Sequence, residues 1–307
     1  MRIRLHKLSL FACLTLAACT SGPAIDALQV SPPSNETTSS VIRPSVGVSM
    51  DENAPPVRAS ALAASPRPAG PAQMQAGSVY GYRFGDAKPI NFGSHAPQKF
   101  AVHGVDVSRW QGEIDWDKLR RYGANFAYIK ATDGGDHLDP KFHENWREAK
   151  RAGIKRGAYH FFYWCRTAAS QAEWFIRNVP KEKGALPPVI DVEWNHQSNC
   201  KKRPPRSDIL DKIRVFSERL ERHYGQRPII YTAPDFYKDN LKGAFLDHPF
   251  WLRSVAAHPS EVYPGRDWLF WQYSGTGLSS AVKGNIDLNA FRGDESDWWR
   301  WVGKVSG

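Results

Sequence analysis

Two acidic residues stand two positions apart at the end of an apolar run. Asp191 and Glu193 close the segment 187–193, whose apolar residues are typical of a buried strand. Because side chains alternate along a strand, the two carboxyl groups point to the same side, with Cα atoms roughly 6.5 Å apart. The pKa values of two acids this close move apart, so one is a candidate proton donor and the other a candidate anion. Such a pair can cleave a glycosidic bond, although acids at a strand end also cap helices or bind a loop arginine.

The segments around this pair alternate between strand and helix patterns from about residue 101 onward. Apolar runs predict eight strands, at 100–107, 126–131, 155–163, 189–193, 228–232, 250–254, 268–273 and 285–288. Helical spacing predicts helices at 115–122, 140–152, 168–178 and 207–224, the last with Ser207 as its N-cap and Gly225 at its end. Repeated βα units build a parallel sheet with right-handed crossovers. We therefore expect an α/β fold, a TIM-like barrel whose last part has lost its helices.

A barrel of this kind carries its site at the carboxyl ends of the strands, where this sequence puts further acids and aromatic residues. The expected strand ends bring Asp106, Asp287, Tyr231, Trp271 and Gln272 beside the first pair. Four carboxyl groups thus gather at one mouth, and aromatic rings there suit the apolar faces of sugars. For Asp106 and Asp287, helix capping or a loop ion pair is an equal alternative. Core packing is the alternative for the aromatic residues.

The first residues form a targeting segment. Three basic residues lie before an apolar run at 8–18, which is too short to span a bilayer. The run ends in Leu16-Ala17-Ala18-Cys19, which resembles the lipobox of bacterial lipoproteins. That resemblance implies removal of residues 1–18 and a lipid on Cys19 that anchors the protein to a membrane; an ordinary cleaved signal is the alternative. Either signal exports the protein. A Thr directly after the Cys, as at Thr20, resembles lipoproteins that are sent to an outer membrane. We therefore expect a periplasmic protein that is lipid-anchored, with the outer membrane favoured over the inner.

Composition divides the rest of the chain. All twelve Trp lie at or after Trp110, whereas residues 20–100 hold eleven of the 22 Pro. We therefore expect a disordered Pro/Ala/Ser-rich linker at 19–77, an N-terminal extension at 78–100 and one domain at 101–307. Loss of the three basic residues in 1–18 lowers the net charge from +10 to +7, which suits an anionic cell wall or an acidic lipid surface. Export, and the lack of basic runs interleaved with aromatic residues, argue against nucleic acid as a partner.

Two cysteines follow expected strands within the domain. Cys165 and Cys200 are a candidate disulfide in an oxidising compartment, and two buried free thiols are the alternative. His and Cys residues lack the pairwise spacing of metal ligands, so we expect neither a metal nor another cofactor. His160, on an expected strand, is interpreted as a hydrogen-bonded core histidine.

Seven short motifs, taken in order, resemble a known family. They are HGVDVSRWQG at 103–112, FAYIKAT at 126–132, GAYHF at 157–161, DVE at 191–193, IYT at 230–232, WQY at 271–273 and IDLN at 286–289. This series, from about residue 101 to 292, is similar to glycoside hydrolase family 25. The resemblance implies a modified barrel with five βα units and three further strands. It also implies a lysozyme of the N-acetylmuramidase type, which cleaves the β-1,4 bond from N-acetylmuramic acid to N-acetylglucosamine in peptidoglycan.

The resemblance also implies roles for individual residues. Glu193 would be the general acid, with its pKa raised by Asp191, and Asp191 would stabilise positive charge on the sugar or orient its 2-acetamido group. Asp106 and Asp287 would complete the acidic cluster. The side chains that would bind the glycan strand of peptidoglycan are those of Tyr159, Tyr231, Trp271 and Gln272. Two mechanisms stay open: attack by the substrate's own acetamido carbonyl with retention, which we favour, or inversion by water activated by a distant acid such as Asp287.

The chain departs from the family pattern at two places. Arg253 stands where family members more often have a small residue, and the basic segment 200–205 follows the DVE strand. That segment either alters the groove or is a surface loop. Two rival functions stay open: a peptidoglycan-binding protein without catalysis, and a glycosidase for another N-acetylglucosamine polymer such as chitin. We expect the protein to be a monomer.

Overall fold

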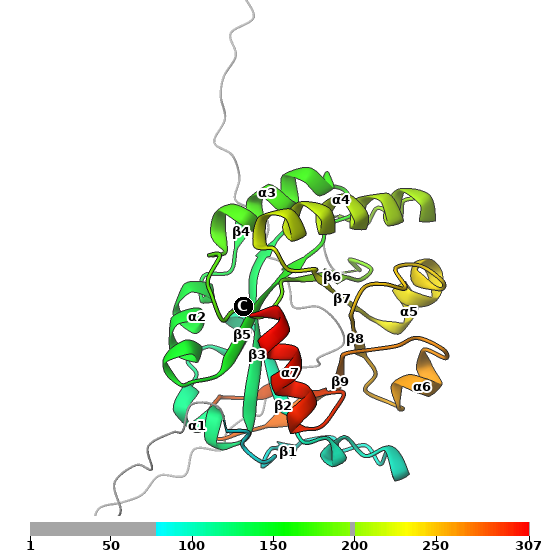
Figure 1. The fold of residues 1–307 in the computed structure, drawn as a ribbon. Coiled ribbons are helices and arrows are strands. Elements are labelled where there is room, and N and C mark those ends of the chain that lie inside the picture. The colour runs from blue at the N-terminus through cyan, green and yellow to red at the C-terminus, as the bar shows by residue number, and fades with distance from the viewer. Residues whose placement is uncertain (1–77, 197–199, 307) are drawn as a thin grey trace, which may run out of the picture. The chain divides into compact units, whose positions relative to one another are not determined.

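Figure 1 shows the computed structural model, which describes residues 78–196 and 200–306. These residues all fall within one compact unit. The expected signal at 1–18, the lipidated Cys19 and the linker at 19–77 lie outside the described residues. Within the described ranges, no helix has the length and apolar character that crossing a membrane requires.

Eight strands form a closed barrel in the described part of the chain (Figure 1). They are β2 (His103–Val107), β3 (Ala124–Asp133), β5 (Lys155–Phe161), β6 (Val189–Val192), β7 (Ile229–Thr232), β8 (Phe250–Arg253), β9 (Phe270–Leu278) and β10 (Asn285–Phe291). Neighbours pair in parallel from β2 through to β9, and β10 closes the ring between β9 and β2. Two short strands, β1 (Gly85–Asp86) and β4 (His137–Leu138), pair with β9 and β3. The expected α/β barrel is confirmed.

The last barrel strand runs against the direction of the others. β10 pairs antiparallel with both β9 and β2, and Asp287 lies opposite Asp106. The expectation that Asp287 stands at the carboxyl end of its strand is wrong, because it lies near the amino end of β10. The connection at 279–284 explains the reversal, since a parallel crossover needs about a dozen residues or more. The reversal still brings Asp287 to the mouth, because that mouth meets the amino end of β10.

Helices follow the first strands and cover the outside of the barrel (Figure 1). They are α1 (Trp116–Arg121), α2 (Phe142–Arg151), α3 (Ala168–Asn178) and α4 (Arg206–Tyr224), close to the expected ranges. After β7 and β8 the chain forms only α5 (Pro234–Phe236), the π-helical turn η4 (Tyr237–Leu241) and α6 (Pro259–Val262). Three 3₁₀ turns, η1 (Gly93–His95), η2 (Pro97–Lys99) and η3 (Arg109–Gln111), precede α1. Between the fifth and the last barrel strand, the expected loss of long helices is therefore observed.

The long helix α4 begins one residue earlier than the sequence predicts. Its N-cap is Pro205, so the assignment of Ser207 as the capping residue is wrong. Arg206 explains the earlier start, because its guanidinium donates hydrogen bonds of 2.9 Å to the backbone carbonyl oxygens of Asn240, within η4, and Lys242, just after it, and so fixes the first turn. The other end agrees with the sequence, since Gly225 adopts a φ of 74° there.

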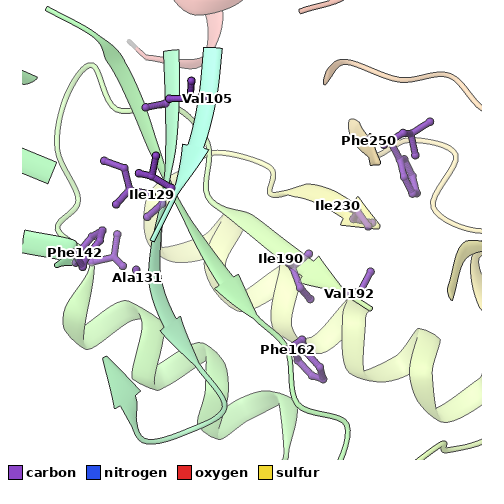
Figure 2. Packing of buried hydrophobic residues seen from close by; sticks show 14 of the residues in the cluster. Val105, Ile129, Ala131, Phe142, Phe162, Ile190, Val192, Ile230 and Phe250 are labelled. Carbon is purple, nitrogen blue, oxygen red and sulfur yellow. The ribbon is translucent and has the colours of Figure 1, made fainter. Parts of the chain in front are cut away.

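The barrel wall separates two hydrophobic cores. On its outer face, side chains such as Ile129, Ile190 and Ile230 meet the surrounding helices. Figure 2 shows Phe142 of α2 beside Ile129 and Ala131 of β3. Because helices cover one face of the sheet and the barrel interior covers the other, most strand residues are buried on both sides.

Large aromatic side chains fill the barrel below its mouth. The ring centroids of Tyr128 and Trp251 lie 5.1 Å apart, and those of Phe126 and Phe270 lie 4.7 Å apart. Space for them comes from glycine, since a Cβ on Gly157 would lie 2.2 Å from the Tyr128 ring. We call these four rings the aromatic floor. Close packing of this kind leaves little room for water beneath the mouth.

A helix that the sequence did not predict closes the opposite end of the barrel. α7 (Glu295–Val305) begins after Asp294, whose side chain accepts a hydrogen bond of 2.8 Å from the backbone N–H of Asp297. Trp298 of α7 is fully buried, and its ring centroid lies 5.5 Å from that of Phe126 inside the barrel.

Residues 78–100 also contact this closed end. The side chain of Asn125, at the amino end of β3, exchanges hydrogen bonds of 2.7 and 2.9 Å with the backbone of Tyr80. The Arg120 guanidinium lies 4.0 Å from the centroid of the Tyr80 ring and donates to the carbonyl oxygen of Ser78 at 2.5 Å. The described chain therefore joins the barrel at the end away from its mouth.

Candidate active site

A cleft opens at the mouth of the barrel, and every barrel strand except β3 contributes to its wall. Its lining includes Asp106, Tyr159, Asp191, Glu193, Tyr231, Gln272 and Asp287, with Ser108, Trp110, Gln111, Trp251 and Arg253. Seven of the eight side chains that the sequence proposed as catalytic or substrate-binding thus lie together in one cleft.

Trp271 is the exception, and its proposed contact with a substrate is wrong. Its side chain is fully buried on the outer face of β9, where the indole N–H donates to the carbonyl oxygen of Ser254 at 2.8 Å. Its ring centroid lies 5.0 Å from that of Phe92. Adjacent residues of a strand face opposite sides, so the inward position of Gln272 puts Trp271 outside. The cleft receives its strand tryptophan from β8 instead, as Trp251.

The paired acids stand where β6 reaches the cleft. Asp191 lies within β6, Glu193 follows its end, and both side chains are buried. Burial raises the pKa of Asp191 well above its usual value, and the nearby Glu193 carboxyl raises it further, while Lys130 opposes the shift. Burial also raises the pKa of Glu193 to about 7. A raised pKa lets a carboxyl group keep its proton at higher pH, as general acid chemistry requires.

One oxygen of this pair lacks a donor. Asp191 Oδ1 is buried and accepts no hydrogen bond from the described residues. A buried acceptor without a partner is destabilising, and this oxygen is suited to a donor that a ligand brings. The described residues contain no group of three or more His, Cys, Asp or Glu side chains that could hold a metal ion.

A chain of hydrogen bonds fixes the opposite wall of the cleft. Asp106 accepts from the side-chain amides of Gln272, at 3.0 Å, and Asn289, at 2.7 Å. Because both amides donate to Asp106, their oxygens face away from it. The Gln272 oxygen accepts from the Tyr231 hydroxyl at 2.9 Å, and the Asn289 oxygen accepts from the Trp251 indole at 2.8 Å. Five strands are thus linked through one carboxylate, which orients the side chains at the mouth.

Several members of this site were not predicted from the sequence. Asn289 stands two residues after Asp287, so strand alternation was a signal for it. The same rule relates Arg253 to Trp251 on β8. Trp110 is 48% exposed at the rim, with the Arg109 guanidinium 4.6 Å from its ring centroid. An exposed aromatic residue directly after the strand of Asp106 was the signal there.

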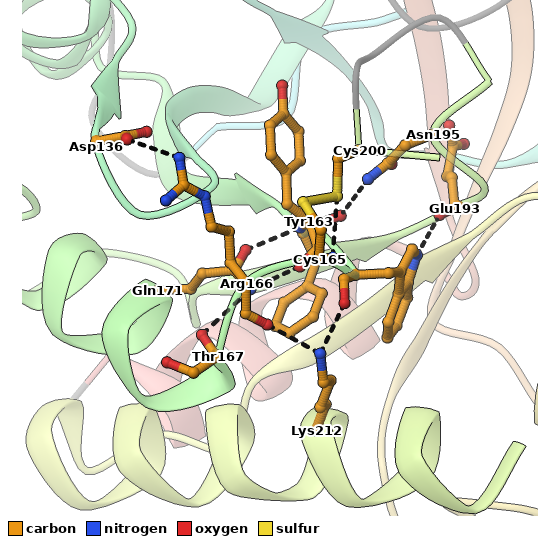
Figure 3. Close-up of a disulfide and its surroundings, with 12 residues drawn as sticks. Asp136, Tyr163, Cys165, Arg166, Thr167, Gln171, Glu193, Asn195, Cys200 and Lys212 are labelled. Carbon is orange, nitrogen blue, oxygen red and sulfur yellow. Dashed lines mark hydrogen bonds and ion pairs between the residues drawn. A yellow bond between two sulfur atoms is a disulfide. The ribbon is translucent and has the colours of Figure 1, made fainter. Parts of the chain in front are cut away.

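A disulfide between Cys165 and Cys200 joins two loops behind the acid pair (Figure 3). Their Cα atoms lie 5.5 Å apart. In the same place the Trp164 indole donates to the backbone carbonyl of Glu193 at 2.7 Å. Lys212 of α4 donates to the carbonyl oxygen of Trp164, also at 2.7 Å. The backbone that carries Glu193 is therefore tied both to the neighbouring loop and to α4.

The basic segment 200–205 does not reach the cleft. None of its residues lines the cleft, and Arg203 instead lies over the ring of Trp194, 4.6 Å from its centroid. Of the two interpretations of this segment, the surface loop agrees with the structure.

Comparison with known proteins gives a consistent result. The model of the family glycosyl hydrolases family 25 matches residues 105–282. The uncharacterized protein YegX of Escherichia coli O157:H7 is 35% identical over 232 residues, which cover 73% of this chain and 80% of that protein. Lysozyme M1 of Streptomyces globisporus is 35% identical over 203 residues, covering 62% of this chain and 68% of that protein.

Solved structures show the same similarity. A family 25 glycosyl hydrolase from Bacillus anthracis superimposes with a TM-score of 0.63 at 40% identity, covering 69% of this chain and 98% of that one. A GH25 lysozyme from Aspergillus fumigatus gives a TM-score of 0.58 at 27% identity, covering 67% of this chain and 99% of that one.

Removal of the disulfide should destabilise the domain. Replacement of Cys165 and Cys200 by Ser opens a loop that spans 35 residues of sequence, and we expect a loss of about 2–4 kcal/mol in the free energy of unfolding because the unfolded chain gains freedom. Urea denaturation measures the change. A reducing agent should lower the wild-type midpoint similarly and leave the double variant unaffected. Equal midpoints for the oxidised wild type and the variant would contradict the expectation.

Proposed function

The chain belongs to glycosyl hydrolases family 25, and from this premise we propose that it is a peptidoglycan hydrolase of the lysozyme type. As a family member it is a glycoside hydrolase. We propose that it cleaves the β-1,4 bond between N-acetylmuramic acid and N-acetylglucosamine. The observation that carries this proposal is the buried pair of acids in a cleft that opens to solvent. The similarity to Lysozyme M1 supports the choice of substrate.

Glu193 is the general acid in this proposal. With a pKa of about 7 it keeps a proton in mildly acidic solution, and it transfers this proton to the glycosidic oxygen as the bond to the sugar carbon breaks. The carbonyl of Glu193 is held by Trp164, so its backbone stays in place while the side chain gives up and regains the proton.

Asp191 acts on the sugar rather than on the leaving group. Its buried Oδ1 accepts the N–H of the 2-acetamido group, which aims the acetamido carbonyl oxygen at the anomeric carbon. That oxygen forms a bond to the carbon as the leaving oxygen departs with the proton of Glu193. Water then opens the resulting ring, Glu193 recovers a proton, and the configuration is retained. An inverting scheme has one observation in its favour, since Asp287 on β10 lies across the eight-stranded ring from β6 and could activate water there.

Replacement of the proposed acid should abolish most of the activity. Glu193→Gln keeps the shape of the side chain but carries no transferable proton, so we expect turnover to fall by roughly 10² or more. Mass spectrometry of products released from purified sacculi measures this. The matched control is Glu218→Gln, an exposed carboxyl on α4, which should leave turnover unchanged.

The same products test the rest of the proposal. Fragments that end in reducing N-acetylmuramic acid support a muramidase, and their initial anomeric configuration distinguishes retention from inversion. Release of no fragment by the wild type would favour a binding protein, and cleavage of chitin alone would favour the other glycosidase. Near-normal activity of Glu193→Gln would show that the acid is misassigned.

Activity should fall as the pH rises through about 7. The protonated form of Glu193 is the active one, and its pKa is raised from 4.5 to about 7 by burial; Asp235 and Asp106 add to the shift, while Arg253 and a hydrogen bond with Tyr231 oppose it. Protonation is therefore complete well below 7 and is lost above it. Initial rates on solubilised glycan strands give the profile of kcat/KM. A decline that already begins near 4.5 would contradict the raised pKa.

We propose further that the protein is exported and held at a membrane by a lipid on Cys19. This proposal depends on the sequence of residues 1–19, which lie outside the described residues. Wild-type protein expressed in a bacterium should sediment with membranes, whereas Cys19→Ala should be found in the soluble fraction. Cys13→Ala, inside the signal, is the matched control and should behave as the wild type. A Cys19→Ala variant that stays with the membranes would refute the anchor.

A further inference from the structure

One basic side chain stands among the acids of the cleft. Arg253 on β8 is the only Lys or Arg among the described residues that line it. It follows Trp251 by two positions and therefore faces the same interior. In the parallel pairing of β8 with β9 it lies beside Gln272, which donates to Asp106. Arg253 thus belongs to the wall that carries the hydrogen-bond chain described above.

The backbone of Arg253 is fixed by a hydrogen bond, whereas its guanidinium has no carboxylate of the described residues in contact. Its own backbone carbonyl accepts from the Tyr263 hydroxyl at 2.5 Å. Burial lowers the pKa of Arg253, but the neighbouring Tyr231, Glu193 and Asp287 raise it, so that it lies above its usual value. However, no carboxylate oxygen of the described residues lies within ion-pair distance of it, and it makes no side-chain hydrogen bond with them. The N–H groups of the partly buried Arg253 side chain can therefore donate hydrogen bonds to a ligand.

The chemistry of this side chain selects the kind of ligand. A guanidinium presents paired N–H donors that match the two oxygens of a carboxylate. A cleft lined by four acids repels an anion, and Arg253 is the one lining residue that attracts it. We propose that Arg253 is a specificity-determining residue that binds a carboxylate carried by the substrate. An uncharged N-acetylglucosamine polymer offers no such group.

This inference rests on the proposed function and makes its substrate class narrower. Arg253 lines the same cleft as Glu193, which donates its proton to the glycosidic oxygen. A carboxylate that reaches Arg253 must therefore belong to a sugar beside the cleaved bond, or to a peptide attached to that sugar. In peptidoglycan one of these two sugars always carries a lactyl group. The carboxylate is either that of the free lactyl group or one from the attached peptide.

The test compares substrates that differ only in charge. Glycan strands freed of peptide are used with the lactyl carboxylate free or converted to its amide, and peptide-bearing strands are used with their carboxylates free or amidated. Rates are measured at about pH 5, where Glu193 is protonated in every variant. The wild type should prefer a carboxylate form by tenfold or more in kcat/KM, which corresponds to about 1.4 kcal/mol. Preference on peptide-free strands identifies the lactyl group, and preference only on peptide-bearing strands identifies the peptide.

Variants of Arg253 show whether its side chain causes the preference for the carboxylate form. Arg253→Gln should lose the preference, because KM rises more on the carboxylate form than on the amidated form. Arg253→Lys should keep part of the preference, because it retains the charge but not the paired donors. The control Arg219→Gln, on the surface of α4, should behave as the wild type. An equal loss on both forms in Arg253→Gln, or no preference by the wild type on either kind of strand, would overturn the proposal.

A binding measurement separates this proposal from the proposed function. Glu193→Gln removes catalysis, and calorimetry in that background gives the Kd for each form of the strands. A tenfold tighter Kd for the carboxylate form, lost when Arg253→Gln is added, supports the carboxylate site even if the wild type releases no fragments and the proposed function fails. Equal Kd values for the two forms overturn the carboxylate site even if the wild type proves to be a muramidase.

Discussion

The burial of two carboxyl groups at the end of β6 is the constraint on which the site depends. Moving a carboxylate out of water costs several kcal/mol unless it is paired or protonated. Asp191 and Glu193 are both buried, and Asp191 leaves one oxygen without a donor. The rest of the fold has to hold this arrangement in place. The disulfide and the Trp164 hydrogen bond do so from behind, and the hydrogen-bond chain through Asp106 keeps the opposite wall in one geometry.

The aromatic floor helps to keep the two carboxyl groups away from water. Rings of Tyr128 and Trp251 fill the barrel directly below the cleft, and close packing keeps water from reaching the acids from that side. An apolar floor raises the pKa of a carboxyl group, because it disfavours the charged form. The position of Gly157 beneath Tyr128 therefore contributes to acid chemistry at a distance, by allowing a large ring where a Cβ would collide. The packing of the aromatic floor and the raised pKa values of the two acids therefore depend on each other.

The sequence predicted the barrel and its acids well because both depend on local patterns. Apolar runs and strand ends placed Asp106, Asp191 and Glu193 at one mouth. The failures concern information that is not local. Strands buried on both faces have no alternation of polar and apolar residues, so nothing in the pattern told which of Trp251 and Trp271 faces inward. The direction of β10 and the position of α7 depend on how the ring closes. Strand alternation was a signal for Asn289 and Arg253, but their surroundings in the cleft come from neighbouring strands.

The attachment of residues 78–100 determines at which end of the barrel another molecule can be joined to the chain. Asn125 and Arg120 secure Ser78 and Tyr80 beneath the amino ends of the parallel strands. A fusion partner joined directly before Ser78 would therefore be attached at the end of the barrel away from the cleft. The cleft opens at the other end, so such an attachment leaves the approach of a long polymer unobstructed.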